Sequence, residues 1–100
     1  MKIDAVRKFA LGLPDATEAP HFDKNSFRVH GKIFVTVPPP GKHIHVFVGE
    51  ARREPALALH PDAVTKLLWG GKVVGLKVDL EQCPAAEVKA LVRAAWEERA

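Results

Sequence analysis

Hydrophobic residues recur every three or four positions near both ends of the chain, which is the spacing of an amphipathic helix. The first such segment starts near Asp4, a candidate helix cap, and ends at Gly12 and Pro14. The second follows Pro84, since proline is tolerated at the first position of a helix. The two apolar stripes contain Val6, Phe9, Ala10 and Leu13 in the first segment and Val88, Leu91, Val92, Ala95 and Trp96 in the second. Two helices packed through these stripes are therefore predicted.

Apolar and polar residues alternate in much of the intervening region, which indicates strands. Residues 26–37 predict a hairpin with its turn at residues 30–32, and residues 64–80 predict another around Gly70 and Gly71. The register of the first hairpin stays open, because odd and even loop lengths exchange the faces of a strand. A three-residue loop would group Phe27 with Ile33, Val35 and Val37, and a two-residue loop would group Phe34 with Phe27 and Val29.

The remaining segments complete the order of elements. Residues 15–25 read as a polar connection, and residues 43–48 as a third strand after the prolines at 38–40. A short helix is predicted near residues 51–60, with its regular part starting at Pro55. The order α-β(3)-α-β(2)-α predicts an α+β fold, in which helices cover an antiparallel sheet of about five strands. At this length, residues 1–100 are expected to form a single domain.

Composition adds modest constraints. Apolar residues make up 47% of the chain, enough for a core, and the net charge of +3 permits an anionic partner without demanding one. Charges run through the first eight residues, so we expect no signal peptide, and no stretch approaches the ~20 apolar residues that span a bilayer. The single cysteine, Cys83, forms no internal disulfide. We expect a cytoplasmic monomer that does not bind membranes.

Two candidate reactive groups are weak. His43 and His45 point to the same side of the predicted strand, as two metal ligands would, but no third ligand follows at a recognisable spacing. A half-exposed sheet face accommodates both histidines equally well. Cys83 lies at a predicted helix start, yet no sequence signature supplies a base beside it. We therefore expect no metal, no cofactor and no enzymatic activity.

Several of these features occur together in a known family. The chain resembles the MmcQ/YjbR family, whose first helix ends in Leu-Pro, with a Glu shortly after and then the pattern F-x-V-x-G-K-x-F. The matching residues are Leu13, Pro14, Glu18, Phe27, Val29, Gly31, Lys32 and Phe34. The resemblance implies a fold similar to that of secretion chaperones and DNA binding by a double wing of two hairpins. It supplies no catalytic motif.

Basic side chains provide the candidate DNA contacts. Five lie in or beside the predicted strand loops, where several could reach phosphates: Lys24, Arg28, Lys32, Lys42 and Lys72. The alternative is a solvated rim, because lysine at sheet edges also prevents unwanted strand pairing. Trp69 could stack on an unpaired base, although packing on the sheet is favoured. A different class of function, a protein-interaction module, would use Phe34, Phe47 or an edge strand.

Overall fold

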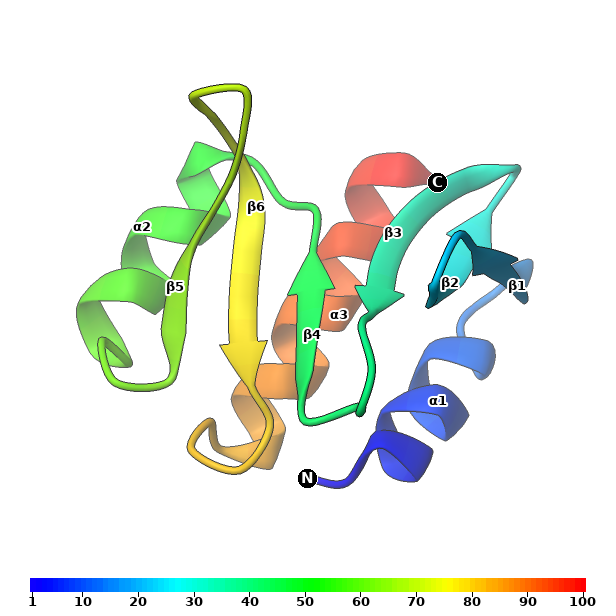
Figure 1. Cartoon of the computed structure of the whole chain (residues 1–100), viewed down its shortest axis with the longest axis horizontal. Helices are drawn as coiled ribbons and strands as arrows, with labels where there is room; N and C mark the ends of the chain where they lie inside the picture. The colour runs from blue at the N-terminus through cyan, green and yellow to red at the C-terminus, as the bar shows by residue number, and fades with distance from the viewer.

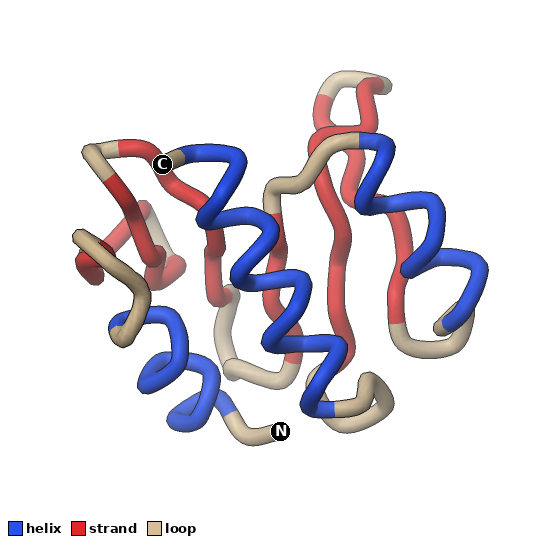
Figure 2. Tube along the Cα trace, turned by 180° about the vertical axis from the view of Figure 1, so that it is seen from behind, coloured by secondary structure: helices blue, strands red, loops and turns tan.

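A six-stranded antiparallel sheet forms the centre of the molecule, and all three helices lie on one of its faces (Figures 1 and 2). The structure is a computed structural model that describes all 100 residues. The helices are α1 (Ile3–Leu11), α2 (Glu50–Leu59) and α3 (Ala85–Arg99). The strands are β1 (Ala16–His21), β2 (Lys24–Val29), β3 (Lys32–Val37), β4 (His43–Val46), β5 (Val64–Trp69) and β6 (Lys72–Asp79).

The strand order in the sheet is β1-β2-β3-β4-β6-β5. Neighbours in sequence therefore pair everywhere except at the centre, where β4 pairs with β6 instead of β5. This pairing joins two hairpins, β2–β3 and β5–β6, into one sheet with β4 between them. The turns of both hairpins lie at the same end of the sheet, the upper end in Figure 1.

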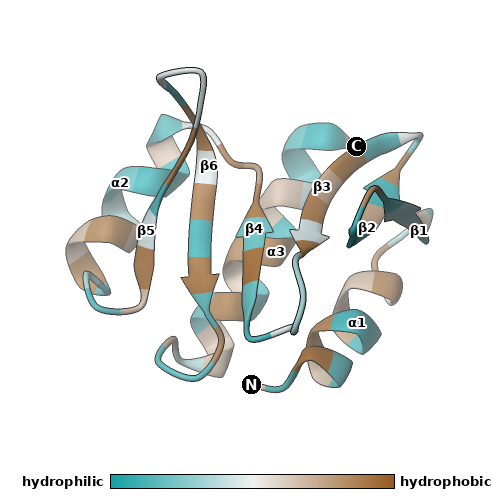
Figure 3. Cartoon of the chain, viewed as in Figure 1, coloured by the Kyte–Doolittle hydropathy of each residue, from teal (hydrophilic) through white to brown (hydrophobic).

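The helices and the inner face of the sheet enclose a core of 23 buried residues. Along β4 and from Leu76 to Asp79 of β6, hydrophobic residues alternate with polar ones (Figure 3), so these segments present their apolar side chains to the helices. Helix α3 packs on β3 and α1, while α2 packs beside β5. The opposite face of the sheet has no helix on it. The α+β prediction and the two apolar helix stripes are thus confirmed.

The predicted number of strands was too low, because residues 16–21 form β1 instead of a polar connection. This edge strand has few β-branched or aromatic residues and contains Pro20, which only an edge position tolerates. It pairs with β2 along its whole length. Glu18 accepts hydrogen bonds from Asn25 and, at 2.7 Å, from Arg7 on α1. The contact with Asn25 is the main reason that the pKa of Glu18 is lowered, with Arg7 adding to it against the opposing effect of burial. Residues 16–21 therefore form a strand because they pair with β2, and not because their side chains favour β structure.

Both hairpins turn through two residues with positive φ. His30 and Gly31 have φ of 51° and 77°, and Gly70 and Gly71 have 57° and 81°. Positive φ at both central positions matches the right-handed twist of the flanking strands, and glycine adopts it without strain. The predicted turn at Gly70 and Gly71 is confirmed.

The first hairpin combines the two registers left open by the sequence. Val29 pairs with Lys32, so the loop has two residues, but a bulge then inserts Phe34 as an extra residue of β3. Phe27 consequently faces Val35 across the ladder. Phe34 and Val35 are both fully buried. The bulge lets consecutive apolar residues enter one core, which strict alternation would forbid.

Smaller corrections concern the ends of elements. Helix α1 begins at Ile3 after Lys2, so Asp4 lies in the first turn and is not the cap. Helix α2 begins at Glu50 and includes Pro55 inside it. Proline removes the donor to the carbonyl of Ala51, and both residues are exposed, so solvent can replace that hydrogen bond. Strand β4 ends at Val46, two residues earlier than predicted. None of the three helices is long and apolar enough to cross a membrane.

Candidate functional site

A row of polar side chains crosses the uncovered face of the sheet. Each lies next to a core residue on its own strand, and cross-strand pairs join them in sequence: Ser26 to Thr36, Thr36 to His45, His45 to Lys77, and Lys77 to Thr65. One polar residue on each of five neighbouring strands therefore faces away from the helices. We call this set the polar row.

Hydrogen bonds hold one half of the polar row in place. Thr36 Oγ1 lies 3.2 Å from His45 Nδ1. The Ser26 hydroxyl donates to the Ala19 carbonyl at 2.6 Å and accepts from Arg28 Nε at 3.2 Å. Ser26 and Thr36 are buried despite their position on the uncovered face, so larger neighbouring side chains cover them. Arg28 is one of these neighbours.

Positive charge surrounds His45. Burial is the main cause that lowers the pKa of His45, and Lys24, Lys77 and His43 lower it further by repulsion. A protonated ring is disfavoured here mainly because burial removes its hydration, and the neighbouring cations add repulsion. Two carboxylates partly offset this charge, since Asp79 lies 3.8 Å from His43 and Asp23 lies 3.5 Å from Lys24. Lys77, unlike Lys24, has no carboxylate partner, so the free positive charge is centred on Lys77.

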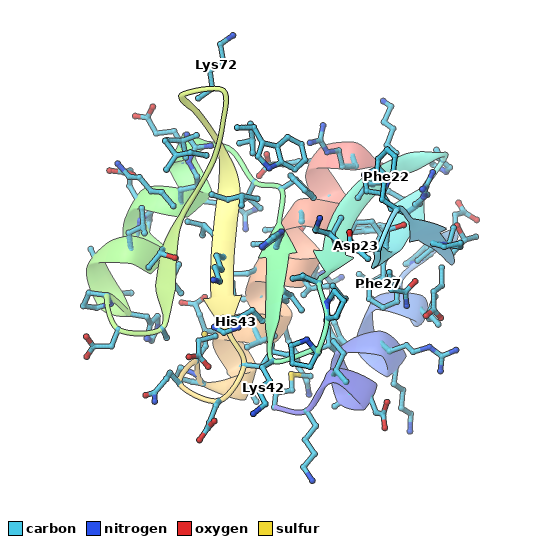
Figure 4. The ribbon with its side chains drawn as sticks, in the orientation of Figure 1. Phe22, Asp23, Phe27, Lys42, His43 and Lys72 are labelled. Carbon is cyan, nitrogen blue, oxygen red and sulfur yellow. The ribbon has the colours of Figure 1, made fainter.

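The structure divides the predicted DNA contacts into three places. Lys32 and Lys72 are exposed at the tips of the two hairpins, at the same end of the sheet. Lys24 and Arg28 are half-buried on β2, and their side chains belong to the uncovered face. Lys42 lies at the opposite end from Lys72, close to the amino terminus (Figure 4). The sequence therefore grouped Lys42 with residues that the fold separates from it.

A cavity of about 200 Å³ lies between the two hairpins on this side of the molecule. It is lined by His21, Ile33, Thr36, Phe47, Trp69 and Arg99. The rings of Phe47 and Trp69 pack together, with centroids 5.4 Å apart and planes at 55°. Trp69 therefore does pack on the sheet, yet 55% of it stays exposed.

The carboxyl-terminal helix also contributes to this cavity. Arg99 places its guanidinium 6.0 Å from the centre of the Phe47 ring, and its Nε is buried without a hydrogen-bond partner. The largest cavity of the molecule, about 490 Å³, lies elsewhere, beside Met1 and Lys42. There the ammonium of Met1 donates a hydrogen bond to the Leu80 carbonyl, at 2.9 Å.

The fold places His43, His45 and Cys83, the candidate reactive groups of the sequence, as follows. His43 and His45 do lie on one side of β4, but no third histidine, cysteine or carboxylate completes a metal site with them. Cys83 is buried, and burial followed by the nearby Glu87 raises the pKa of its thiol. A raised pKa opposes formation of the reactive thiolate at neutral pH.

Two contributors to this face were missed from the sequence, Lys77 and Arg99, and Phe47 was considered only as a residue for protein interaction. Lys77 reaches His45 only through the pairing of β4 with β6, which are separated by a helix and another strand. Phe47 and Arg99 are 52 residues apart by their numbers and meet only in the fold. The alternation of Lys77 between Leu76 and Val78 could have placed it on the solvent face.

Comparison with known proteins identifies related sequences and folds. A family model described as YjbR matches residues 11–98. No curated protein matches the chain. The crystal structure of Deinococcus radiodurans protein DR2400, which carries a DUF419 domain, is similar, with a TM-score of 0.82 at 19% sequence identity. The alignment covers 95% of this chain and 75% of that chain. At this identity the likeness shows a shared fold.

Proposed function

Because the chain belongs to the YjbR family, we propose that it is a non-enzymatic DNA-binding protein that contacts the phosphate backbone. The observation that carries the proposal is the position of its cations. Lys24 and Lys77 lie on a sheet face that no helix covers, and Lys32 and Lys72 project from two turns at one end of that sheet. A phosphate backbone is the polyanion that such spaced cations match.

Binding of this kind is weak and largely indifferent to sequence. A net charge of +3 creates little long-range field, so attraction comes from the local cluster. Base-edge recognition in a major groove requires an exposed helix or ribbon. The apolar faces of α1 and α3 are buried against the sheet and each other, which keeps both helices out of a groove. We further propose that the protein acts as a monomer in the cytoplasm, a reducing compartment that suits its free buried cysteine.

Replacing Lys32 and Lys72 together by alanine should weaken duplex DNA binding and reduce its salt dependence. Each lysine that meets a phosphate contributes about 0.9 to the slope of log affinity against log salt, so the slope should fall by about 1.8. Both residues are exposed at turns, so the far-UV circular dichroism should be unchanged. Fluorescence anisotropy with a labelled duplex across a salt series measures the slope.

The matched control is the double replacement of Lys8 and Lys89 by alanine, which removes the same charge from the exposed side of α1 and α3. This variant should retain most of the salt slope. An equal loss of salt slope in the two double variants would show that binding depends only on the net charge of the protein. Unchanged binding in the Lys32 and Lys72 variant would place the contact elsewhere, and no binding at low salt would refute the proposed function.

DNA affinity should rise as pH falls from about 8 to 6, through His45. Its pKa is lowered in the free protein by burial and by Lys24, Lys77 and His43. A phosphate bound beside these cations favours the charged ring, so binding takes up a proton, and each proton changes affinity by at most about tenfold per pH unit. His45→Gln should flatten the profile, measured by anisotropy at constant salt. Identical profiles in the two proteins would exclude phosphate from the polar row.

The alternative function is protein interaction, and the free edges of the sheet favour it. β1 and β5 each have one unpaired side, and Leu68 on β5 is 55% exposed. An extended peptide can add to such an edge through main-chain hydrogen bonds. Absence of nucleic-acid binding at low salt would favour protein interaction as the function.

A further inference from the structure

The cavity between the two hairpins combines features that a backbone-binding surface does not need. One wall is the half-exposed ring of Trp69, and the buried Phe47 lies beside it. Ile33 and Thr36 come from the other hairpin, so the cavity joins the two halves of the sheet. Its volume of about 200 Å³ is below the ~300–1,000 Å³ of pockets for drug-sized ligands. It suits a single flat ring system.

Polar groups at the cavity indicate what kind of ring would bind. The Nε of Arg99 is buried and finds no acceptor within the chain. Such an unpaired donor is unfavourable until a partner atom arrives. His21 also lines the cavity, and its ring nitrogens offer donor and acceptor atoms. A planar ring with carbonyl or ring-nitrogen acceptors could therefore stack on Trp69 and accept a hydrogen bond from Arg99.

The surrounding charge indicates what the ring is attached to. Trp69 is separated from Lys72 only by the two glycines of the turn, and Ile33 directly follows Lys32. Lys77 of the polar row lies on the same uncovered face as Thr36. One nucleotide within a nucleic-acid strand has these features, since its base is a flat ring and a phosphate lies on either side of it. Paired bases inside a duplex cannot present a free face, whereas single strands combine backbone contacts with stacking on aromatic side chains.

We propose that the cavity between the hairpins binds one unpaired base of a single-stranded nucleic acid, stacked on Trp69. This inference rests on the proposed function, because the same lysines hold the backbone on either side. It adds a preference for strands with accessible bases, independent of their sequence, since every base has an aromatic face.

The decisive variant is Trp69→Ala, tested with a single-stranded oligonucleotide and with a duplex. Loss of one stacked base should weaken single-strand binding about 5- to 150-fold. Duplex affinity and the salt slopes should not change, because no phosphate contact is removed. The control is Leu68→Ala, since Leu68 is equally exposed and alternation turns it to the opposite face of β5. This control should bind like the unaltered protein.

A second measurement leaves the protein unaltered and changes the ligand. A strand of the same length built from abasic sites keeps the phosphates but has no ring to stack. It should bind the unaltered protein as weakly as the normal strand binds Trp69→Ala, and the two changes together should add no further loss. Trp69→Phe should recover most of the affinity because it keeps an aromatic face.

The outcomes separate this inference from the function on which it rests. Equal affinity for normal and abasic strands, or single-strand binding unaffected by Trp69→Ala, would overturn the base site while leaving backbone binding in place. No binding of either strand form at low salt would overturn both. Equal weakening of duplex and single-strand binding by Trp69→Ala would also overturn it, because Trp69 would then act on the shape of the hairpin.

Discussion

Phe27→Ala should lower the free energy of unfolding by about 3–5 kcal/mol, the range observed when a buried phenylalanine is truncated. Phe27 lies in β2 with 1% of its surface exposed and belongs to the single core cluster. Its removal leaves a cavity that a tightly packed core cannot fully close. Against the 5–15 kcal/mol typical of small domains, this is a large fraction of the total stability. Urea unfolding followed by circular dichroism measures it.

Phe22, five residues before Phe27, supplies a matched control (Figure 4). It lies in the β1–β2 turn and is 92% exposed. The same truncation there removes little buried surface, so Phe22→Ala should change stability by less than about 0.5 kcal/mol. Comparable losses at the two positions would mean that the packing of β2 against the helices is wrong.

Gly75→Ala should destabilise the protein by about 3 kcal/mol, the upper end of the effect of overpacking. A Cβ at this buried position of β6 would lie 2.2 Å from the Val46 carbonyl oxygen and 3.2 Å from the Cα of Phe47. Both obstacles are backbone atoms, which cannot move aside as a side chain could. The substitution must therefore push β4 away from β6, at the pairing that joins the two hairpins. Thermal unfolding should show a lowered midpoint.

The control for Gly75 is Gly12→Ala at the end of α1. Gly12 has φ of −78°, and an added Cβ there would meet its nearest atoms at 3.4 Å. Alanine is compatible with this backbone and reduces the freedom of the unfolded chain, so stability should be unchanged or rise by up to about 1 kcal/mol. If Gly75→Ala were equally harmless, the close approach of β4 to β6 would be refuted.

Loss of nucleic-acid binding in Gly75→Ala would have a different cause from loss in the lysine variants, because it would come from a change in the fold and not from a missing charge. The cavity between the hairpins requires β4 to hold both halves of the sheet, because Phe47 directly follows β4 while Trp69 ends β5. A shift of β4 would therefore disturb the aromatic pair without touching Lys32 or Lys72. Gly75→Ala should thus reduce single-strand binding more than it reduces duplex binding.

Local chemistry explains which parts of the fold could be predicted. The stripes of α1 and α3 and the turn at Gly70 and Gly71 depend on residues within a few positions of each other. Helical periodicity and positive φ at glycine act over the same short range. β1 escaped prediction because Ala16–His21 is a strand only through its pairing with β2. Phe34 and Val35 likewise share the core only because of a bulge in the ladder.

The same distinction between local and distant contacts separates the predictable residues of the candidate site from the others. The sequence by itself determined that the chain has two hairpins with basic tips, that Lys32 and Lys72 occupy these tips, and that the first and last helices bury their apolar stripes. Only the tertiary structure decided that β4 pairs with β6, which brings Lys77 to His45. It also packs the ring of Trp69 against that of Phe47, brings the Arg99 guanidinium to the Phe47 ring, and leaves Lys42 at the end of the sheet opposite Lys72. Turns and helices form from interactions between near neighbours in sequence, whereas strand order is set by contacts whose gain must exceed the entropy of closing long loops. A single sequence does not reveal which of those distant contacts is made.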